Sequence, residues 1–183
     1  YDEVQIDEWI PYLLESGIVA ITVHGRTFKQ MYRGEADWVA LSRVGKIVAQ
    51  YNLDKKTQIH YIANGDIDSP QVARERLGQS MADGLYIGRA SYGNPWIFDD
   101  IKSYLSGGTE LIQKHSLEDI AKVAYEHALL HYRVKGESGF IQMRKHLAWY
   151  FRGFAGASRF RLALMETHTP DDVKKIINEI LTQ

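Results

Sequence analysis

Three short, mostly apolar runs, each ending in a polar tip that contains glycine, constrain the fold of this chain more than any other feature. Runs of this length are typical of strands buried on both faces of a parallel sheet. A helical pattern follows each run, so the sequence predicts repeated strand–helix units. The runs and their tips are residues 19–23 before His24, Gly25 and Arg26; 59–63 before Asn64, Gly65 and Asp66; and 84–87 before Gly88 and Arg89.

Apolar residues at helical spacing separate these runs. Ser69 before Pro70 is typical of a helix start, because a capping side chain precedes a proline at the first helical position. Gly78 is expected to end that helix, and residues 51–57 are expected to form a turn. The predicted helices cover residues 6–14, 38–49, 70–77 and a segment that ends near residue 105.

The carboxyl ends of parallel strands meet at one edge of a sheet, which is where α/β proteins bind ligands. In β/α barrels the loops after the last two strands often form a phosphate site. Glycine lets backbone N–H groups approach an anion, and Arg89 would add a forked cationic donor. Under the simpler alternative, Gly65 and Gly88 only make turns and Arg89 is solvated.

His24 and Arg26 follow the first predicted strand. A ring N–H and a guanidinium at this tip would suit the carbonyl-rich edge of a flavin or a pyrimidine. A single histidine at a strand end is also often a hydrogen-bonded structural residue, and that alternative stays open.

Past the predicted linker at residues 106–109, the alternation of strand and helix stops. Helical patterns predict a small bundle, so the expected domains are 1–105 (α/β) and 106–183 (all-α). The expected helices of the bundle cover residues 116–134, 140–151, 158–167 and 169–181, with a turn at residues 136–139.

Several classes of protein are disfavoured by composition. The chain has no cysteine, which removes disulfides and thiolate zinc sites. His127 and His131 are four residues apart but have no evident third ligand, so we expect no metal site. No serine lies in a nucleophile-elbow context. No apolar run approaches the roughly 20 residues needed to cross a bilayer, and no signal peptide is visible, so we expect no membrane partner and a cytoplasmic location.

The predicted bundle carries a strongly basic stretch. Residues 133–161 contain seven lysines and arginines against one acidic residue, Glu137. A basic helix face with aromatic residues nearby suits a phosphate backbone and an unstacked base; a solvated charged face is the alternative. The candidate RNA-binding residues are Arg144, Lys145, Trp149 and Arg152.

Together these motifs resemble the second half of a tRNA-dihydrouridine synthase. The resemblance rests on four motifs in the same order and with matching spacing. They are residues 24–27, residues 62–67, residues 87–90 with 93–96, and a stretch from Arg144 through Tyr150 and Gly153 to Ala157. Ala155 departs from the pattern, since many members of the family have proline there.

The resemblance implies the C-terminal part of a (β/α)8 TIM barrel, about three β/α units, followed by a helical tRNA-binding domain. It implies FMN as cofactor, NADPH as reductant and reduction of uridine in tRNA to dihydrouridine. By motif match, His24 would contact the flavin ring. The ribityl phosphate region would be held by Asn64, Gly65, Asp66, Gly88 and Arg89. The tRNA would contact Arg26 and the four residues of the basic helix named above.

In that family the catalytic cysteine lies in the earlier half of the barrel, which we expect upstream of Tyr1. The 183-residue chain is therefore predicted to be a C-terminal fragment, to be inactive alone and to retain FMN weakly. Two other functions stay open: a small-molecule flavin oxidoreductase of the dihydropyrimidine or dihydroorotate dehydrogenase type, and a non-enzymatic RNA-binding module.

Overall fold

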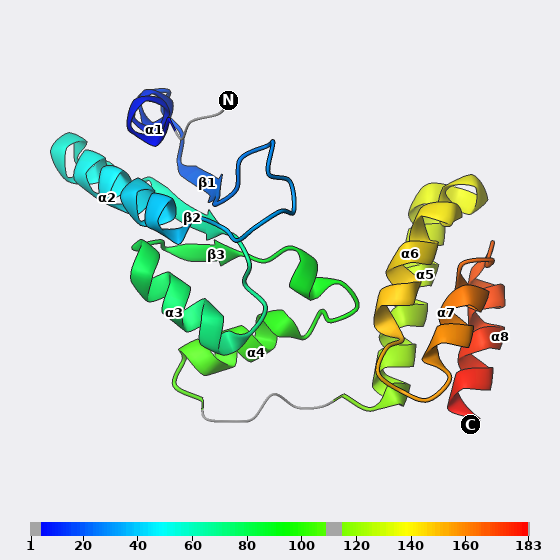
Figure 1. Ribbon diagram of the computed structural model, residues 1–183. Helices are drawn as coiled ribbons and strands as arrows, with labels where there is room; N and C mark the ends of the chain where they lie inside the picture. The colour runs from blue at the N-terminus through cyan, green and yellow to red at the C-terminus, as the bar shows by residue number, and fades with distance from the viewer. Residues whose placement is uncertain (1–4, 109–114, 183) are drawn as a thin grey trace. The chain divides into compact units, whose positions relative to one another are not determined.

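A three-stranded parallel sheet in the order β1-β2-β3 forms the centre of the first part of the chain (Figure 1). The computed structural model describes residues 5–108 and 115–182. In the register of the sheet, His24 pairs with Asn64, and Asn64 pairs with Tyr86. The three predicted tips therefore begin side by side at one edge. The strands are β1 (Ala20–His24), β2 (His60–Asn64) and β3 (Gly84–Tyr86).

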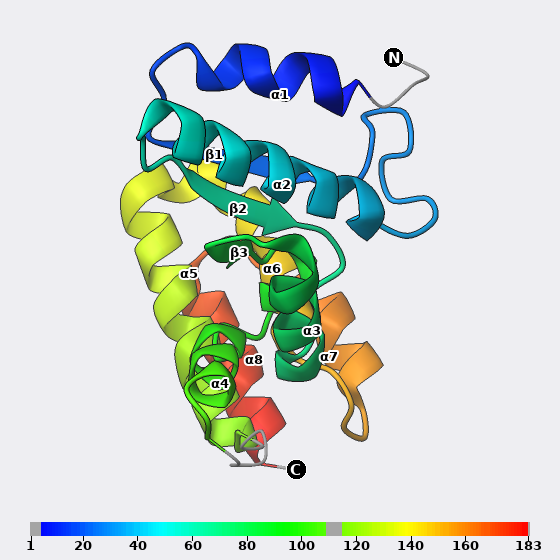
Figure 2. The same ribbon diagram turned by 90° about the vertical axis from the view of Figure 1, so that its left-hand side faces the viewer.

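Four helices accompany this sheet, and each packs against the next one along the chain. Figure 2 shows α1 and α2 running alongside each other beside β1 and β2. The Asp37 side chain caps α2 by accepting from the Ala40 N–H, and Ser69 caps α3 in the same way. The helices are α1 (Ile6–Leu14), α2 (Trp38–Lys55), α3 (Pro70–Ser80) and α4 (Ile97–Leu105); a short 3-10 helix covers Arg89–Ser91.

The prediction was wrong about where α2 and α3 end. The predicted turn at residues 51–57 is helical as far as Lys55, because the Asn52 side chain ties the helix end to the start of β2. Asn52 donates to the Ile59 carbonyl at 2.9 Å and accepts from the Ile59 N–H at 2.9 Å. Gly78 does not end α3, which continues to Ser80 and stops where Met81 adopts a left-handed backbone.

The second part of the chain is helical, as predicted. Side-chain capping boxes at Ser116 and Thr169 start its first and last helices. The first helix continues through the predicted turn at residues 136–139, with an interruption at Gly136, which has φ +69°. The helices are α5 (Leu117–Gly139), α6 (Met143–Tyr150), α7 (Ala157–Leu164) and α8 (Pro170–Leu181), with a 3-10 turn at Phe140–Gln142.

Each part has its own apolar core. Tyr61, Val44 and Ala63 are almost fully buried in the first, where the Tyr61 hydroxyl donates to the Leu41 carbonyl at 3.0 Å. In the second, residues from all four helices contribute: Ala124, Phe140, Met143, Leu147, Phe151, Phe160, Leu164 and Val173. The fold class is thus confirmed: three parallel β/α units, as in part of a TIM barrel, then a helical region.

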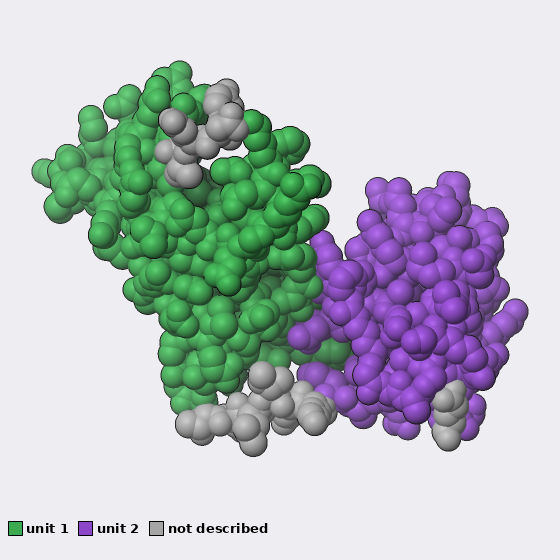
Figure 3. Space-filling model, in the orientation of Figure 1, with its two compact units in different colours: residues 1–91, 96–109 green, residues 92–95, 110–183 purple. Residues whose placement is uncertain are grey.

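The chain divides into two compact units, coloured separately in Figure 3. Unit 1 comprises residues 1–91 and 96–109, and unit 2 comprises residues 92–95 and 110–183. The sequence division at residue 105 does not anticipate that residues 92–95 group with the helices. Thr109, the last residue of the predicted linker, lies outside the described residues. No helix in the described ranges is long and apolar enough to cross a membrane.

Candidate functional site

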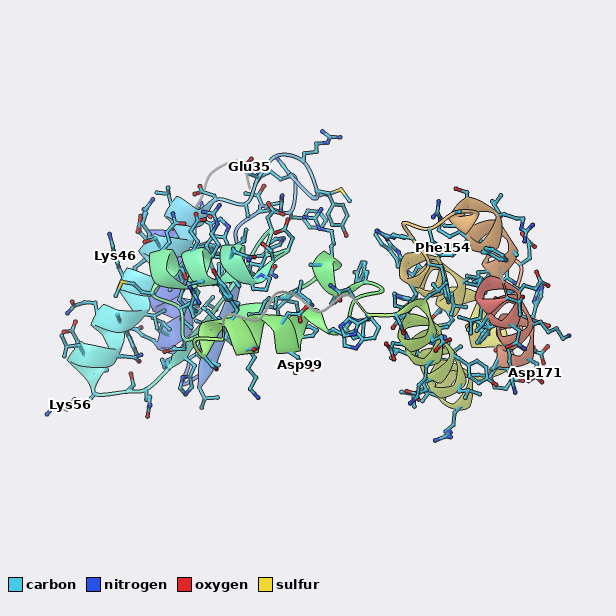
Figure 4. The ribbon with its side chains drawn as sticks, turned by 90° about the horizontal axis from the view of Figure 1, so that it is seen from below. Glu35, Lys46, Lys56, Asp99, Phe154 and Asp171 are labelled. Atoms are coloured by element: carbon cyan, nitrogen blue, oxygen red, sulfur yellow. The ribbon has the colours of Figure 1, made fainter. Side chains whose placement is uncertain are left out.

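The Asp66 carboxylate, just after β2, accepts hydrogen bonds from polar groups at the strand tips of unit 1. Its Oδ1 accepts from Arg26 Nη1 at 2.8 Å and from Arg89 Nη2 at 2.7 Å. Its Oδ2 accepts from Arg26 Nη2 at 2.5 Å and from the Ala36 N–H at 2.9 Å. One carboxylate thus joins residues that follow all three strands. In Figure 4, Glu35 marks the loop that supplies Ala36, while Lys56 lies at the far end of α2.

The backbone before this carboxylate has the conformation that the Asn64-Gly65-Asp66 sequence allows. Gly65 has φ +154°, and a Cβ there would come within 2.5 Å of the Ala36 Cβ. Asp66 itself has φ +47°, a left-handed conformation that aspartate tolerates better than most residues. Gly65 is therefore required by the close approach of the 25–37 loop. Gly88 is different, because a Cβ there would meet no atom within 4 Å.

Arg26 was predicted to contact the substrate, but the structure places its side chain inside the network, only 4% exposed. Its Nη2 also donates to the Gly34 carbonyl at 2.7 Å. Its Nε is buried without a hydrogen-bond partner among the described residues. Through these hydrogen bonds, Arg26 links the 25–37 loop to the tip of β2.

Arg89 has the opposite environment. Its side chain is 49% exposed, and its guanidinium lies 5.2 Å from the centre of the Tyr32 ring. The Arg26 hydrogen bonds, the Ala36 N–H and both arginine charges hold the pKa of the Asp66 carboxyl below its usual value, although partial burial opposes them. Asp66 therefore stays ionised at neutral pH, and two guanidinium groups against one carboxylate leave a net positive tip.

His24 and Asn64 link neighbouring strands at the same edge. His24 Nδ1 lies 3.0 Å from the Asn64 carbonyl oxygen, which only accepts, so Nδ1 carries the proton. In the neutral ring, Nε2 is then an acceptor and suits a ligand N–H; it donates only when the ring is charged. The Asn64 side chain donates to the Tyr86 carbonyl at 2.6 Å.

A cavity of about 750 Å³ borders β1 on the side of α1. His24, Gly25 and Arg26 contribute to its wall, together with apolar side chains of α1 and α2 such as Trp9 and Leu41. Asn64, Asp66 and Arg89 do not line it. Arg26 is therefore the member of the charged tip network that borders this cavity, while Asp66 and Arg89 lie outside its wall.

In unit 2, two of the four candidate RNA-binding residues, Trp149 and Arg152, stack on each other. The Arg152 guanidinium lies over the Trp149 ring, 3.7 Å from its centre. Tyr92 meets Trp149 edge-on at 5.5 Å. Burial, and then the neighbouring charge of Arg161, lower the pKa of Arg152 from its usual value. A hollow of about 480 Å³ is lined by Ala148, Trp149, Arg152 and Arg161.

The other two predicted residues of the basic helix have different surroundings. Arg144 Nε donates to the Thr167 carbonyl at 2.7 Å, and its Nη2 lies 3.1 Å from His168 Nδ1. Arg144 is therefore partly used in joining α6 to the start of α8. Lys145 is exposed.

Comparison with known proteins then decides the family. Residues 2–183 match the family described as dihydrouridine synthase (Dus). The chain belongs to the dihydrouridine synthase family. It is 38% identical over 168 residues to a probable tRNA-dihydrouridine synthase of Rickettsia bellii. The aligned region covers 91% of this chain and 48% of that protein. It is 40% identical over 148 residues to tRNA-dihydrouridine synthase B of Pseudomonas syringae, or 80% of this chain and 41% of that protein.

This dihydrouridine synthase chain spans about half the length, or slightly less, of the curated relatives it matches. A probable tRNA-dihydrouridine synthase 1 of Synechocystis matches 98% of the chain at 31% identity, again over 48% of its own length. The similarity therefore runs through both units.

The histidines of unit 2 have protein partners in this synthase-family chain. His127 Nδ1 lies 3.1 Å from the Tyr150 hydroxyl, and His131 Nε2 lies 3.1 Å from the Gly139 carbonyl. Within residues 5–108 and 115–182, no group of three or more ligating side chains could hold a metal.

Sequence reasoning missed several residues that the structure adds to these sites. The Ala36 N–H on Asp66 has no sequence signal, because any residue there supplies the same donor. Arg161 was counted only as part of a basic stretch, although it lines the hollow beside Trp149. Tyr92 lies next to Gly93 in a motif of the family resemblance, which is the one signal that could have identified it.

Proposed function

We propose that the chain forms the C-terminal part of a flavin-dependent tRNA-dihydrouridine synthase, with an FMN phosphate site in unit 1 and a tRNA-binding surface in unit 2. Family membership supports the reaction class. The observation that carries the proposal for this chain is the tip network, in which Arg89 stays half-exposed beside Gly88 at the end of the third strand.

The residues at the tips fit FMN. The backbone at Gly88 opens onto free space, and the neighbouring guanidinium supplies charge-assisted donors for a phosphate. His24 directs Nε2 away from its carbonyl partner and is left to orient a flavin ring. When bound, FMN supplies hydride transfer, with NADPH as its reductant. Asn64, Gly65, Asp66, Gly88 and Arg89 are proposed to form or support the phosphate end of this site.

In unit 2 we propose that Trp149, Arg152 and Lys145 contact tRNA, with Arg161 added from the structure. No lysine or arginine among the described residues 115–182 forms an ion pair with a carboxylate within 4 Å, so the proposed RNA-binding cations have no direct carboxylate partner. Arginine stacked on an aromatic ring offers a flat cationic surface to a phosphate or a base.

The basic surface favours tRNA over a small-molecule substrate, because a free pyrimidine has no phosphate backbone for such a surface to bind. The purely RNA-binding alternative predicts that tRNA affinity does not depend on the flavin site. The chain contains no cysteine to donate a proton, so we propose that the 183 residues alone are inactive.

Two measurements test the function. Purified 183-residue chain with FMN, NADPH and unmodified tRNA should form no dihydrouridine, whereas the complete protein that carries it should form it. The complete protein should also bind tRNA with an affinity that falls steeply as salt rises. A complete protein that reduces free uracil but binds no tRNA would overturn the proposal in favour of a small-molecule oxidoreductase.

A further inference from the structure

The Asp66 carboxylate has no acceptor site left for a ligand. Two oxygens offer about four lone-pair positions, and the structure fills them with four hydrogen bonds, three from the two arginines and one from Ala36. An ionised carboxylate donates nothing. A bound phosphate would therefore gain no hydrogen bond from Asp66 and would be repelled by its charge.

Arg26 and Arg89 use Asp66 in different ways. Arg26 is almost fully buried, and a buried guanidinium needs a compensating charge. Arg89 is half-exposed, and its one hydrogen bond among the described residues goes to Asp66 through Nη2. An arginine side chain on a surface otherwise has considerable rotamer freedom, which an anion must restrict on binding.

We propose that Asp66 is a positioning residue: it balances the buried Arg26 and, through Arg89 Nη2, holds the remaining guanidinium donors at the strand tips for the phosphate of the flavin. The inference rests on the proposed function and assigns a different role from direct phosphate contact. It makes Arg89 the side chain that meets the anion and Asp66 the group that fixes it in advance.

This role predicts an effect opposite in sign to simple electrostatics. If Asp66 were only a nearby negative charge, Asp66→Asn would remove repulsion and strengthen FMN binding. If it positions Arg89, the same substitution weakens binding, because asparagine offers one neutral oxygen in place of two charged ones. Its NH2 group would face donors, either those of Arg26 Nη2 and Ala36 or, with the amide reversed, Arg89 Nη2, and any hydrogen bond kept by Arg89 loses its charge assistance. Losing one preformed charge-assisted hydrogen bond corresponds to about tenfold in affinity.

The experiment measures binding of FMN and of riboflavin, which lacks the phosphate, to the complete protein by quenching of flavin fluorescence. The ratio of the two affinities isolates the contribution of the phosphate. Asp66→Asn should lower the FMN preference by about tenfold with riboflavin affinity unchanged. In an Arg89→Gln background, Asp66→Asn should have no further effect on the ratio.

A matched variant separates positioning from loss of folding. Arg26→Gln with Asp66→Asn removes the buried cation together with its counter-charge, so no unpaired guanidinium is left inside. This double variant should also lose the FMN preference. If either variant keeps or increases the preference, Asp66 does not position Arg89. If the unaltered protein binds riboflavin as tightly as FMN, the proposed phosphate site itself is wrong.

Discussion

The two units treat their arginines differently. In unit 1, Arg26 and Arg89 share one carboxylate, and the arginine that matters most for the loop is buried. In unit 2, Arg152 lies on an aromatic ring, and Arg144 donates to a backbone carbonyl. A carboxylate partner fixes a guanidinium in place and offsets its positive charge. An aromatic ring or a backbone carbonyl also fixes the guanidinium but carries no net charge, so the positive charge remains. The first arrangement suits a small site that needs exact geometry, and the second suits a long polyanion.

The largest expected effect is on the stability of the helical unit, at a glycine that packs against the backbone of Trp149. Gly93 has φ +69°, and a Cβ there would lie 2.3 Å from the Trp149 carbonyl oxygen. Gly93→Ala should therefore lower the free energy of unfolding of the helical unit by about 3 kcal/mol, combining backbone strain with the clash. Gly153, with φ +77° and no atom near its Cβ, is the control. Gly153→Ala should cost about 1 kcal/mol in thermal unfolding; equal effects would show that Gly93 is not packed against the Trp149 backbone.

The next effect tests whether the buried Arg26 of unit 1 contributes to the stability of the fold. Arg26→Gln should lower the free energy of unfolding by about 2 kcal/mol, less than for a fully buried pair because Asp66 is 32% exposed. Arg43, which pairs with Asp7 in the same unit, is the control, since its side chain is 48% exposed and that of Asp7 is 66% exposed. Arg43→Gln should change urea unfolding by about 0.5 kcal/mol or less. Similar losses in the two variants would contradict a special role for the buried arginine.

A smaller effect on tRNA affinity is expected at the Trp149 and Arg152 surface of unit 2. Arg152→Gln should weaken tRNA binding about fivefold at low salt and reduce the slope of log affinity against log salt by about one. Lys175, an exposed lysine on α8, is the comparison residue. Lys175→Gln should change affinity by less than about twofold. Filter-binding or fluorescence anisotropy titrations would measure both, and a larger loss at Lys175 would place the RNA surface elsewhere.

The smallest effect is a pH dependence confined to unit 2. Burial is the main cause that lowers the pKa of both His127 and His146, with charges of other histidines and of Lys145 adding to it. A histidine whose folded pKa is depressed binds protons more readily when unfolded, so its contribution is present above about pH 6.5 and is lost as the pH falls below it. Thermal unfolding of the helical unit should shift down between pH 7.5 and 5.5. His127→Gln should reduce that shift, and an unchanged shift would assign it to other groups.

The strands and their tips could be predicted closely from the sequence. Predicted runs at 19–23, 59–63 and 84–87 became strands at Ala20–His24, His60–Asn64 and Gly84–Tyr86. Short apolar runs between glycine-bearing tips carry a local signal, so boundaries shift by one residue. The end of α2 could not be predicted, because it depends on the hydrogen bonds between Asn52 and Ile59.

The sequence by itself determined the class of fold, the family and the residue types at each site. Periodicity, capping residues and tip motifs are properties of neighbouring residues, and they suffice for those conclusions. Only the tertiary structure decided which cation is buried and which is available. Arg26 and Arg89 look equivalent as residues after a strand, yet one is enclosed by the 25–37 loop and the other faces outward. The burial of Arg26 and its pairing with Asp66 require segments forty residues apart in the sequence to meet at one carboxylate. No pattern among neighbouring residues contains that information.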